Sequence, residues 1–120
     1  MSTNFASIEI NTLSSFSFIA GTKQILNFDA METNGSQIDL STATCSVVFS
    51  PYGDYTYAAI TVSGSVSGSL ISRFTAILTG SSTQSLSGKY TMQPVIVDAG
   101  GNEFRPGQGV VLITGRNATI

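Results

Sequence analysis

Residues 43–50 read ATCSVVFS. Successive side chains of a β-strand point to opposite faces, so the alternation predicts a strand that buries Cys45, Val47 and Phe49. The residues between them are expected to face outward. The same period of two occurs along most of the chain, whereas no stretch of ten or more residues keeps apolar positions at helical spacing. The chain is therefore expected to be all-β.

Turn signals divide the chain at short intervals. Glycine, proline and asparagine cluster at 21–22, 33–36, 51–54 and 99–102, while 64–68 is expected to be a flexible hairpin loop and 80–87 a polar loop. The strands predicted between them are 5–10 with 15–20, 23–31, 43–50, 55–63, 70–79, 88–98 and 103–115. Pro94 lacks a backbone donor, so its strand should be bulged there or lie at an edge. This spacing predicts an immunoglobulin-like antiparallel β-sandwich of about seven strands.

The length of 120 residues fits a single domain, 1–120, because no interior linker or repeat interrupts it. Residues 1–13 are expected to form either the first strand or an assembly arm that extends a partner's sheet. Candidate interface residues in this segment are Phe5, Ile8 and Ile10.

Charge is sparse. Only 10% of the residues are charged, the formal net charge is −2, and the five basic residues are dispersed. Nucleic acid is therefore not an expected partner. A surface with few charged side chains also costs little free energy to desolvate against another protein. The sequence begins without a basic segment followed by an apolar run and contains no apolar stretch of 18 residues, so neither a signal peptide nor a membrane span is expected.

The residues needed for most enzymatic chemistry are missing. The chain has no His, no Trp and one Cys, whereas Ser and Thr account for 32 residues (18 and 14). Without imidazole, Ser-His-Asp and Cys-His catalysis and His-containing zinc sites are excluded. We expect no enzyme activity and no catalytic, cofactor-binding or metal-binding residues. Cys45, inside an apolar run, is expected to be a buried small side chain rather than a reactive thiol.

Calcium is the strongest remaining idea for a small ligand. Oxygen-bearing side chains cluster in two turn regions, although their spacing matches no known calcium loop. The alternative is that they are solvated turn carboxylates. The residues concerned are Asp98, Asn102 and Glu103 in one region and Asp29, Glu32 and Asp39 in the other.

Aromatic residues are concentrated at Tyr52, Tyr55 and Tyr57. Three interpretations stay open: Tyr55 and Tyr57 pack in the core while Tyr52 caps a turn, the three anchor a protein interface, or they stack on carbohydrate. A second tyrosine, in Gly88-Lys89-Tyr90, matches the tyrosine corner of immunoglobulin-like sandwiches, in which the ring packs inside and the hydroxyl bonds to upstream backbone. Gly88 and Tyr90 are therefore assigned a structural role.

Six short segments between about residues 15 and 114 follow one another in a recognisable order: Gly21-Thr22, Asp29-Ala30, 38–44, 86–90, 98–102 and Pro106-Gly107. Together they resemble the N-terminal domain of the baseplate upper proteins of tailed phages. That family has an immunoglobulin-like sandwich with an early turn, an Asp-Leu-Thr-Gly-Ala-like segment, a Gly-x-Tyr strand start and a late glycine-rich hairpin. This chain has Ser41-Thr42 where the family tends to have Thr-Gly.

The resemblance implies a non-enzymatic structural protein of a tailed-phage virion, at the baseplate or tail or as a capsid decoration. Its expected partners are other virion proteins and copies of itself, with no nucleic acid and no membrane. It would be made in the host cytoplasm and located in the virion. The alternative is a module that binds carbohydrate or a host surface. A bacterial adhesion or pilus-like domain is a further rival, but it would require export.

Overall fold

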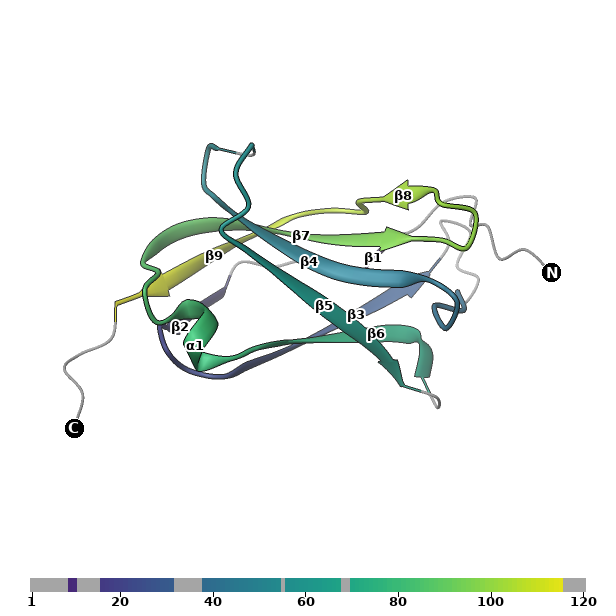
Figure 1. Cartoon of the computed structure of the whole chain (residues 1–120), viewed down its shortest axis with the longest axis horizontal. Helices are drawn as coiled ribbons and strands as arrows, with labels where there is room; N and C mark the ends of the chain where they lie inside the picture. The colour runs from purple at the N-terminus through teal and green to yellow at the C-terminus, as the bar shows by residue number, and fades with distance from the viewer. Residues whose placement is uncertain (1–8, 11–15, 32–37, 55, 68–69, 116–120) are drawn as a thin grey trace.

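The computed structural model describes residues 9–10, 16–31, 38–54, 56–67 and 70–115. Apart from one helical turn, its regular elements are strands (Figure 1). In chain order they are β1 (Glu9–Ile10), β2 (Phe16–Ile19), β3 (Gln24–Met31), β4 (Thr44–Pro51), β5 (Ile60–Ser67), β6 (Leu70–Leu78), α1 (Gly80–Thr83), β7 (Gly88–Val97), β8 (Glu103–Phe104) and β9 (Gly109–Thr114).

The strands form one curled sheet in the order β1-β3-β6-β5-β4-β7-β9-β2, with β8 beside β7. The curl brings β3 and β6 beneath β4, β7 and β9, so that the sheet makes two layers (Figure 1). All described pairings are antiparallel except that of β2 with β9, which is parallel. β1 and β8 have two residues each, and the other seven described strands are longer. The predicted all-β sandwich of about seven strands is confirmed.

Strand β5 belongs to both layers. Residues Ile60 to Ser63 pair with β4, whereas the strand from Gly64 onward pairs with β6. A Cβ built on Gly64 would lie 2.5 Å from a ring carbon of Phe74. The chain therefore changes partners at a residue without a side chain, because the close approach to the core ring leaves no room for one.

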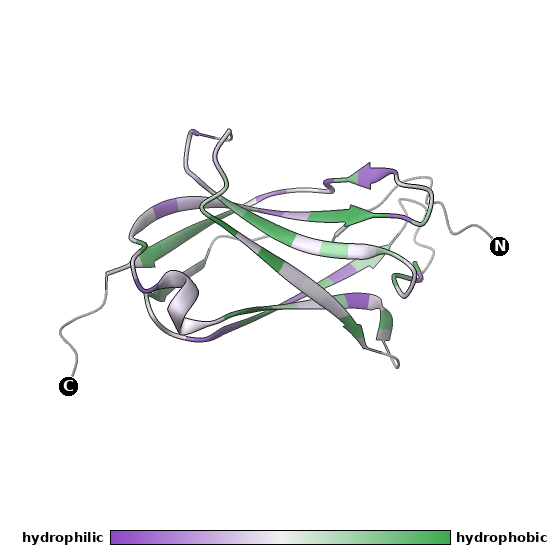
Figure 2. Ribbon diagram, in the orientation of Figure 1, coloured by the Kyte–Doolittle hydropathy of each residue, from purple (hydrophilic) through white to green (hydrophobic). Residues whose placement is uncertain are grey.

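The inward faces of the two layers fill the interior. On β3 and β6, Phe28 and Phe74 are registered partners whose ring centroids lie 4.9 Å apart. From the facing layer, Cys45, Val47 and Phe49 on β4 are all buried, as the alternation predicted. Burying each large apolar side chain stabilises the fold by about 1.5–3 kcal/mol. In Figure 2 the hydrophobic colour marks the strands of both layers, while β8 is largely hydrophilic.

Two element boundaries on the β4–β5–β6 side were predicted wrongly. The strand expected at 55–63 begins only at Ile60, and residues 56–59 belong to the connection from β4. The loop expected at 64–68 is strand up to Ser67. The serine and glycine content of this segment is typical of loops, but here Gly64 permits the change of layer and the serines are polar positions of a strand.

Two further predicted segments differ in detail. The loop expected at 80–87 contains the short helix α1, whose buried Thr83 accepts a hydrogen bond from the Gly21 backbone N–H at 2.9 Å. The last strand, expected at 103–115, is split into β8 and β9 by residues 105–108. Pro106 lies in this break and has no backbone N–H to offer a neighbouring strand.

Pro94 lies inside β7, opposite Val47 of β4, and that pairing runs through it without a shift. On its other side β7 pairs with β9 only up to Met92 and with β8 only from Ile96. Pro94, which has no backbone N–H, thus lies in the gap between the part of β7 that pairs with β9 and the part that pairs with β8. It is locally at an edge, as expected of a strand proline.

We expect Cys45 to react slowly in the folded protein. Burial raises the pKa of its thiol to about 11. At about pH 8 this lowers the thiolate fraction on the order of 100-fold relative to a free thiol, and the thiolate is the reactive form. Iodoacetamide labelling followed by mass spectrometry measures the rate, with the same reaction in denaturant as the control. Equal rates in the two conditions would contradict this expectation.

Candidate functional site

A groove runs over the outward face of the layer that contains β4 and β7. Val48 and Ser50 on β4 face away from the core, because they alternate with the buried Val47 and Phe49. Their registered partners on β7 are Gln93 and Thr91, respectively. These two cross-strand pairs form the floor of the groove.

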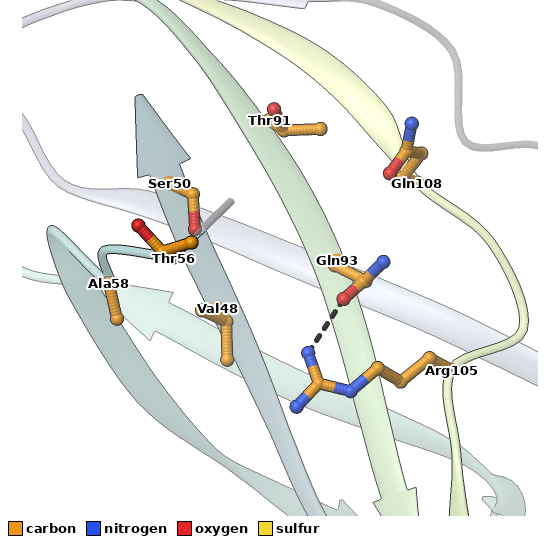
Figure 3. A pocket seen from close by; sticks show the side chains of 8 residues that line it. All are labelled: Val48, Ser50, Thr56, Ala58, Thr91, Gln93, Arg105 and Gln108. Carbon is orange, nitrogen blue, oxygen red and sulfur yellow. Dashed lines mark hydrogen bonds between the residues drawn. The ribbon is translucent and has the colours of Figure 1, made fainter. Parts of the chain in front are cut away.

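Two connections form its walls. Thr56 and Ala58 come from the segment between β4 and β5, and Arg105 and Gln108 come from the segment between β8 and β9 (Figure 3). The groove has a volume of about 500 Å³, within the range of sites for small ligands. The groove walls thus come from the two segments that the sequence predicted as strand, residues 56–59 before β5 and residues 105–108 between β8 and β9.

The wall on the β9 side is held by a small polar network. The Arg105 guanidinium donates to the Gln93 Oε1 at 2.7 Å (Figure 3). It also donates to the Glu103 Oε2 at 2.9 Å. The Arg105 side chain is still 43% exposed, so the network fixes its direction without removing it from solvent.

The floor contains one polar atom without a partner. Thr91 is 3% exposed, and its Oγ1 makes no hydrogen bond within the described part of the structure. Leaving a buried hydroxyl unpaired costs about 1–3 kcal/mol. The neighbouring Ser50 is also buried, so two hydroxyl-bearing side chains lie side by side on adjacent strands.

Two tyrosines lie close in sequence to the groove residues, and neither lines the groove. Tyr57, between the wall residues Thr56 and Ala58, is 58% exposed. Tyr52 is 56% exposed, and the Lys89 Nζ lies 4.8 Å from its ring centroid. The core-packing interpretation is therefore wrong for Tyr57, because the residue lies in a connection rather than on an inward strand face. Tyr55 lies outside the described residues.

The carboxylates considered for calcium are occupied by protein donors. Asp98 is buried and accepts hydrogen bonds from the backbone N–H groups of Gly100 and Asn102 at 3.0 and 2.9 Å. Glu103 pairs with Arg105. Among the described residues no group of three His, Cys, Asp or Glu side chains is arranged to hold a metal ion.

The described carboxylates of the second region also bind protein donors, and each binds a different one. Asp29 pairs with Arg73, whose hydrogen bond lowers the pKa of that carboxyl. Hydrogen bonds from the hydroxyl and backbone of Ser41 likewise lower the pKa of Asp39. Glu32 lies outside the described residues. These aspartates act as turn and strand-pair acceptors.

The predicted tyrosine corner has one of its two features in place. Tyr90 is 9% exposed and packs in the core, and Gly88 has a φ of +106°, which favours glycine. The hydrogen bond from the Tyr90 hydroxyl to upstream backbone is not among those made by the described residues, so the corner stays a prediction.

The predicted N-terminal interface is placed only in part. Ile10 lies in β1, where its backbone position is opposite Ala30 of β3. Phe5 and Ile8 lie outside the described residues, so the assembly arm stays a prediction. No helix in the described ranges is long and apolar enough to cross a membrane.

Sequence reasoning missed the groove residues. Ser50 and the pair Thr91 and Gln93 appear in the sequence as ordinary positions of two strands, at least 41 residues apart in the chain. Pro106-Gly107 was the available signal for the interruption between β8 and β9, and connections at strand ends often carry binding residues. Their convergence on one face depends on the pairing of β4 with β7, which the sequence does not specify locally.

Comparison with known proteins identifies the fold and no family. No family model and no curated protein matches the chain. CopC from Methylosinus trichosporium OB3b has a similar structure, with a TM-score of 0.54 and 8% identity over 94% of this chain and 99% of CopC. The fibronectin(III)-like modules of Clostridium thermocellum CbhA give a TM-score of 0.50 and 20% identity over 92% and 99% of the two chains. The chain is thus an immunoglobulin- or fibronectin III-like β-sandwich.

Proposed function

We propose that this protein is a non-enzymatic structural component of a tailed-phage virion that acts by protein–protein assembly. The observation that best supports assembly is the pair Ile25 and Ile77 on the outward face of β3 and β6. They are registered partners and are 58% and 43% exposed. Covering such apolar surface with a partner gains about 25 cal/mol per Å². The virion assignment itself is supported by the resemblance of residues 15–114 to baseplate upper proteins.

The rest of that face has the character of an interface rim. Next to the isoleucine pair, the Thr75 hydroxyl donates to the Asn27 Oδ1 at 2.7 Å. Beyond it, Arg73 and Asp29 form an ion pair across the same two strands. An apolar contact bordered by satisfied polar groups is the usual arrangement of a protein interface. The partners we propose are other virion proteins and copies of this chain, with no nucleic acid and no membrane.

The assembly surface is tested by replacing both isoleucines with serine. Sedimentation velocity is expected to show that the wild-type protein associates with itself or with candidate capsid and tail proteins, and that Ile25→Ser/Ile77→Ser does not. The matched control, Asn27→Ser/Thr75→Ser, changes the same strands and face, keeps both isoleucines and should still associate. A wild-type protein that stays monomeric and joins no candidate would contradict the proposal.

The virion assignment has a separate test. Mass spectrometry of purified particles of the phage that encodes the chain is expected to find it in stoichiometric amounts. Its absence from such particles, or a coding sequence far from head and tail genes, would contradict the assignment while leaving the assembly surface to be judged by sedimentation.

A further inference from the structure

The groove on β4 and β7 offers hydrogen-bonding groups that the fold itself does not use. Thr91 is almost completely buried, yet its hydroxyl has no partner among the described residues, and Ser50 lies beside it. Stability alone would favour valine at position 91, because valine has the same shape without the unpaired hydroxyl. A polar group kept at a cost to stability is typical of a functional site.

The residues around the groove exclude several ligand classes. None of the described lining residues carries a carboxylate, which disfavours a cation, and the one charged residue among them, Arg105, already donates to Glu103 and Gln93. An anion would therefore have to compete with the Glu103 carboxylate for Arg105. Of the described lining residues only Val48 and Ala58 are apolar, so a hydrophobic ligand would leave most of these polar groups unsatisfied.

An added peptide strand is disfavoured. At the floor of the groove β4 and β7 pair with each other, and on their outer sides Val48 is paired with β5 and Thr91 with β9. Strand addition requires an open sheet edge with unpaired backbone groups. The groove offers side chains on a sheet face instead, so its ligand must be recognised through hydroxyls and amides.

We propose that this groove binds a neutral saccharide. Sugar hydroxyls donate and accept hydrogen bonds, and they match the hydroxyls of Thr91 and Ser50 and the amides of Gln93 and Gln108. The Thr91 Oγ1 has less than 1 Å² of accessible surface, so contact with a sugar hydroxyl requires the side chains that cover it to shift. This site lies on a different face from the Ile25–Ile77 surface and does not depend on the assembly role.

The exposed rings add a second mode of contact. Tyr57 lies on the wall segment, and Tyr52 follows Ser50 by two residues at the end of β4. Aromatic faces pack well against the C–H face of a pyranose while keeping their hydroxyls in water. Tyr52 and Tyr57 lie within two residues of Ser50 and Thr56 in the chain, and we include them in the candidate site although neither lines the groove.

Amide NMR titration with maltose, cellobiose, lactose and chitobiose tests this site. At least one of these disaccharides is expected to shift the amide signals of Val48, Gln93 and Arg105 in a saturable way at millimolar concentration. Thr91→Val should weaken that binding about tenfold, the loss expected from one hydrogen bond. The same variant should unfold at a higher temperature than the wild type, because an unpaired buried hydroxyl has been removed.

The combination of the two readouts makes the test decisive. The control Thr75→Val removes a hydroxyl on the opposite layer and should leave saccharide binding unchanged. Gln93→Ala provides a second groove variant that should also weaken binding. The proposal is overturned if no disaccharide shifts the groove amides, if Thr91→Val and Gln93→Ala bind as tightly as the wild type, or if only a peptide or sialyllactose binds there.

Discussion

Phe49→Ala is expected to lower the free energy of unfolding by about 3–5 kcal/mol, the usual cost of removing a fully buried phenylalanine ring. Phe49 has no exposed surface and lies opposite Ile60 and Met92 on the strands at either side. Its backbone carbonyl also accepts the Ala59 N–H at 2.8 Å, where the chain returns toward β5. The substitution leaves a cavity that paired strands cannot close by a small shift.

Urea denaturation followed by circular dichroism measures this loss. Ile25→Ala is the matched control, since Ile25 is 58% exposed on β3 in the other layer and should change stability by no more than about 0.5 kcal/mol. Equal effects of the two substitutions would mean that β4 does not bury Phe49 and that the proposed core is wrong.

Gly64→Ala is expected to destabilise the protein by about 1–3 kcal/mol, although it adds only one methyl group. The new Cβ would lie 2.5 Å from Cδ2 of Phe74 and 3.4 Å from the Cβ of Cys45. Phe74 cannot retreat easily, because its ring is stacked on Phe28 at an interplanar angle of 20°. The expected consequence is separation of β5 from β6 at the change of layer.

A double-mutant cycle isolates this contact. Phe74→Leu should cost less in the Gly64→Ala background than in the wild type, because the smaller side chain makes room for the methyl. Gly115→Ala is the control, since a Cβ there meets no atom within 4 Å. If Gly64→Ala behaves like Gly115→Ala, the strand does not cross beside Phe74.

The parts of the fold that the sequence predicts are those in which one strand has one buried face. β3, β4 and β6 alternate regularly, Phe49 is buried as expected, and Phe28 and Phe74 are buried on the corresponding faces of their strands. β5 violates this rule, because its two halves serve different layers and its polar residues resemble a loop. Tyr57 was misplaced for a related reason: alternating aromatics predict a strand, but the segment forms a wall above β4.

The candidate site was less predictable than the core. The tyrosines were identifiable from their density in the sequence, whereas Thr91 and Gln108 have no local signal. Their importance arises from which strands are neighbours and from where two connections rise above the sheet. An unpaired hydroxyl is likewise a property of three-dimensional surroundings, because the same threonine would be satisfied by water at an exposed position.

The parallel pairing of β2 with β9 has a consequence for biosynthesis. Phe16 lies opposite Val111, so this edge of the molecule forms only after about 95 intervening residues have been translated. Until then β2 has no place in the sheet, and contacts between such distant residues slow folding. During that interval the nascent chain exposes an unpaired sheet edge to which other nascent chains can add. We therefore expect aggregation to begin before the chain is released from the ribosome and β9 can pair.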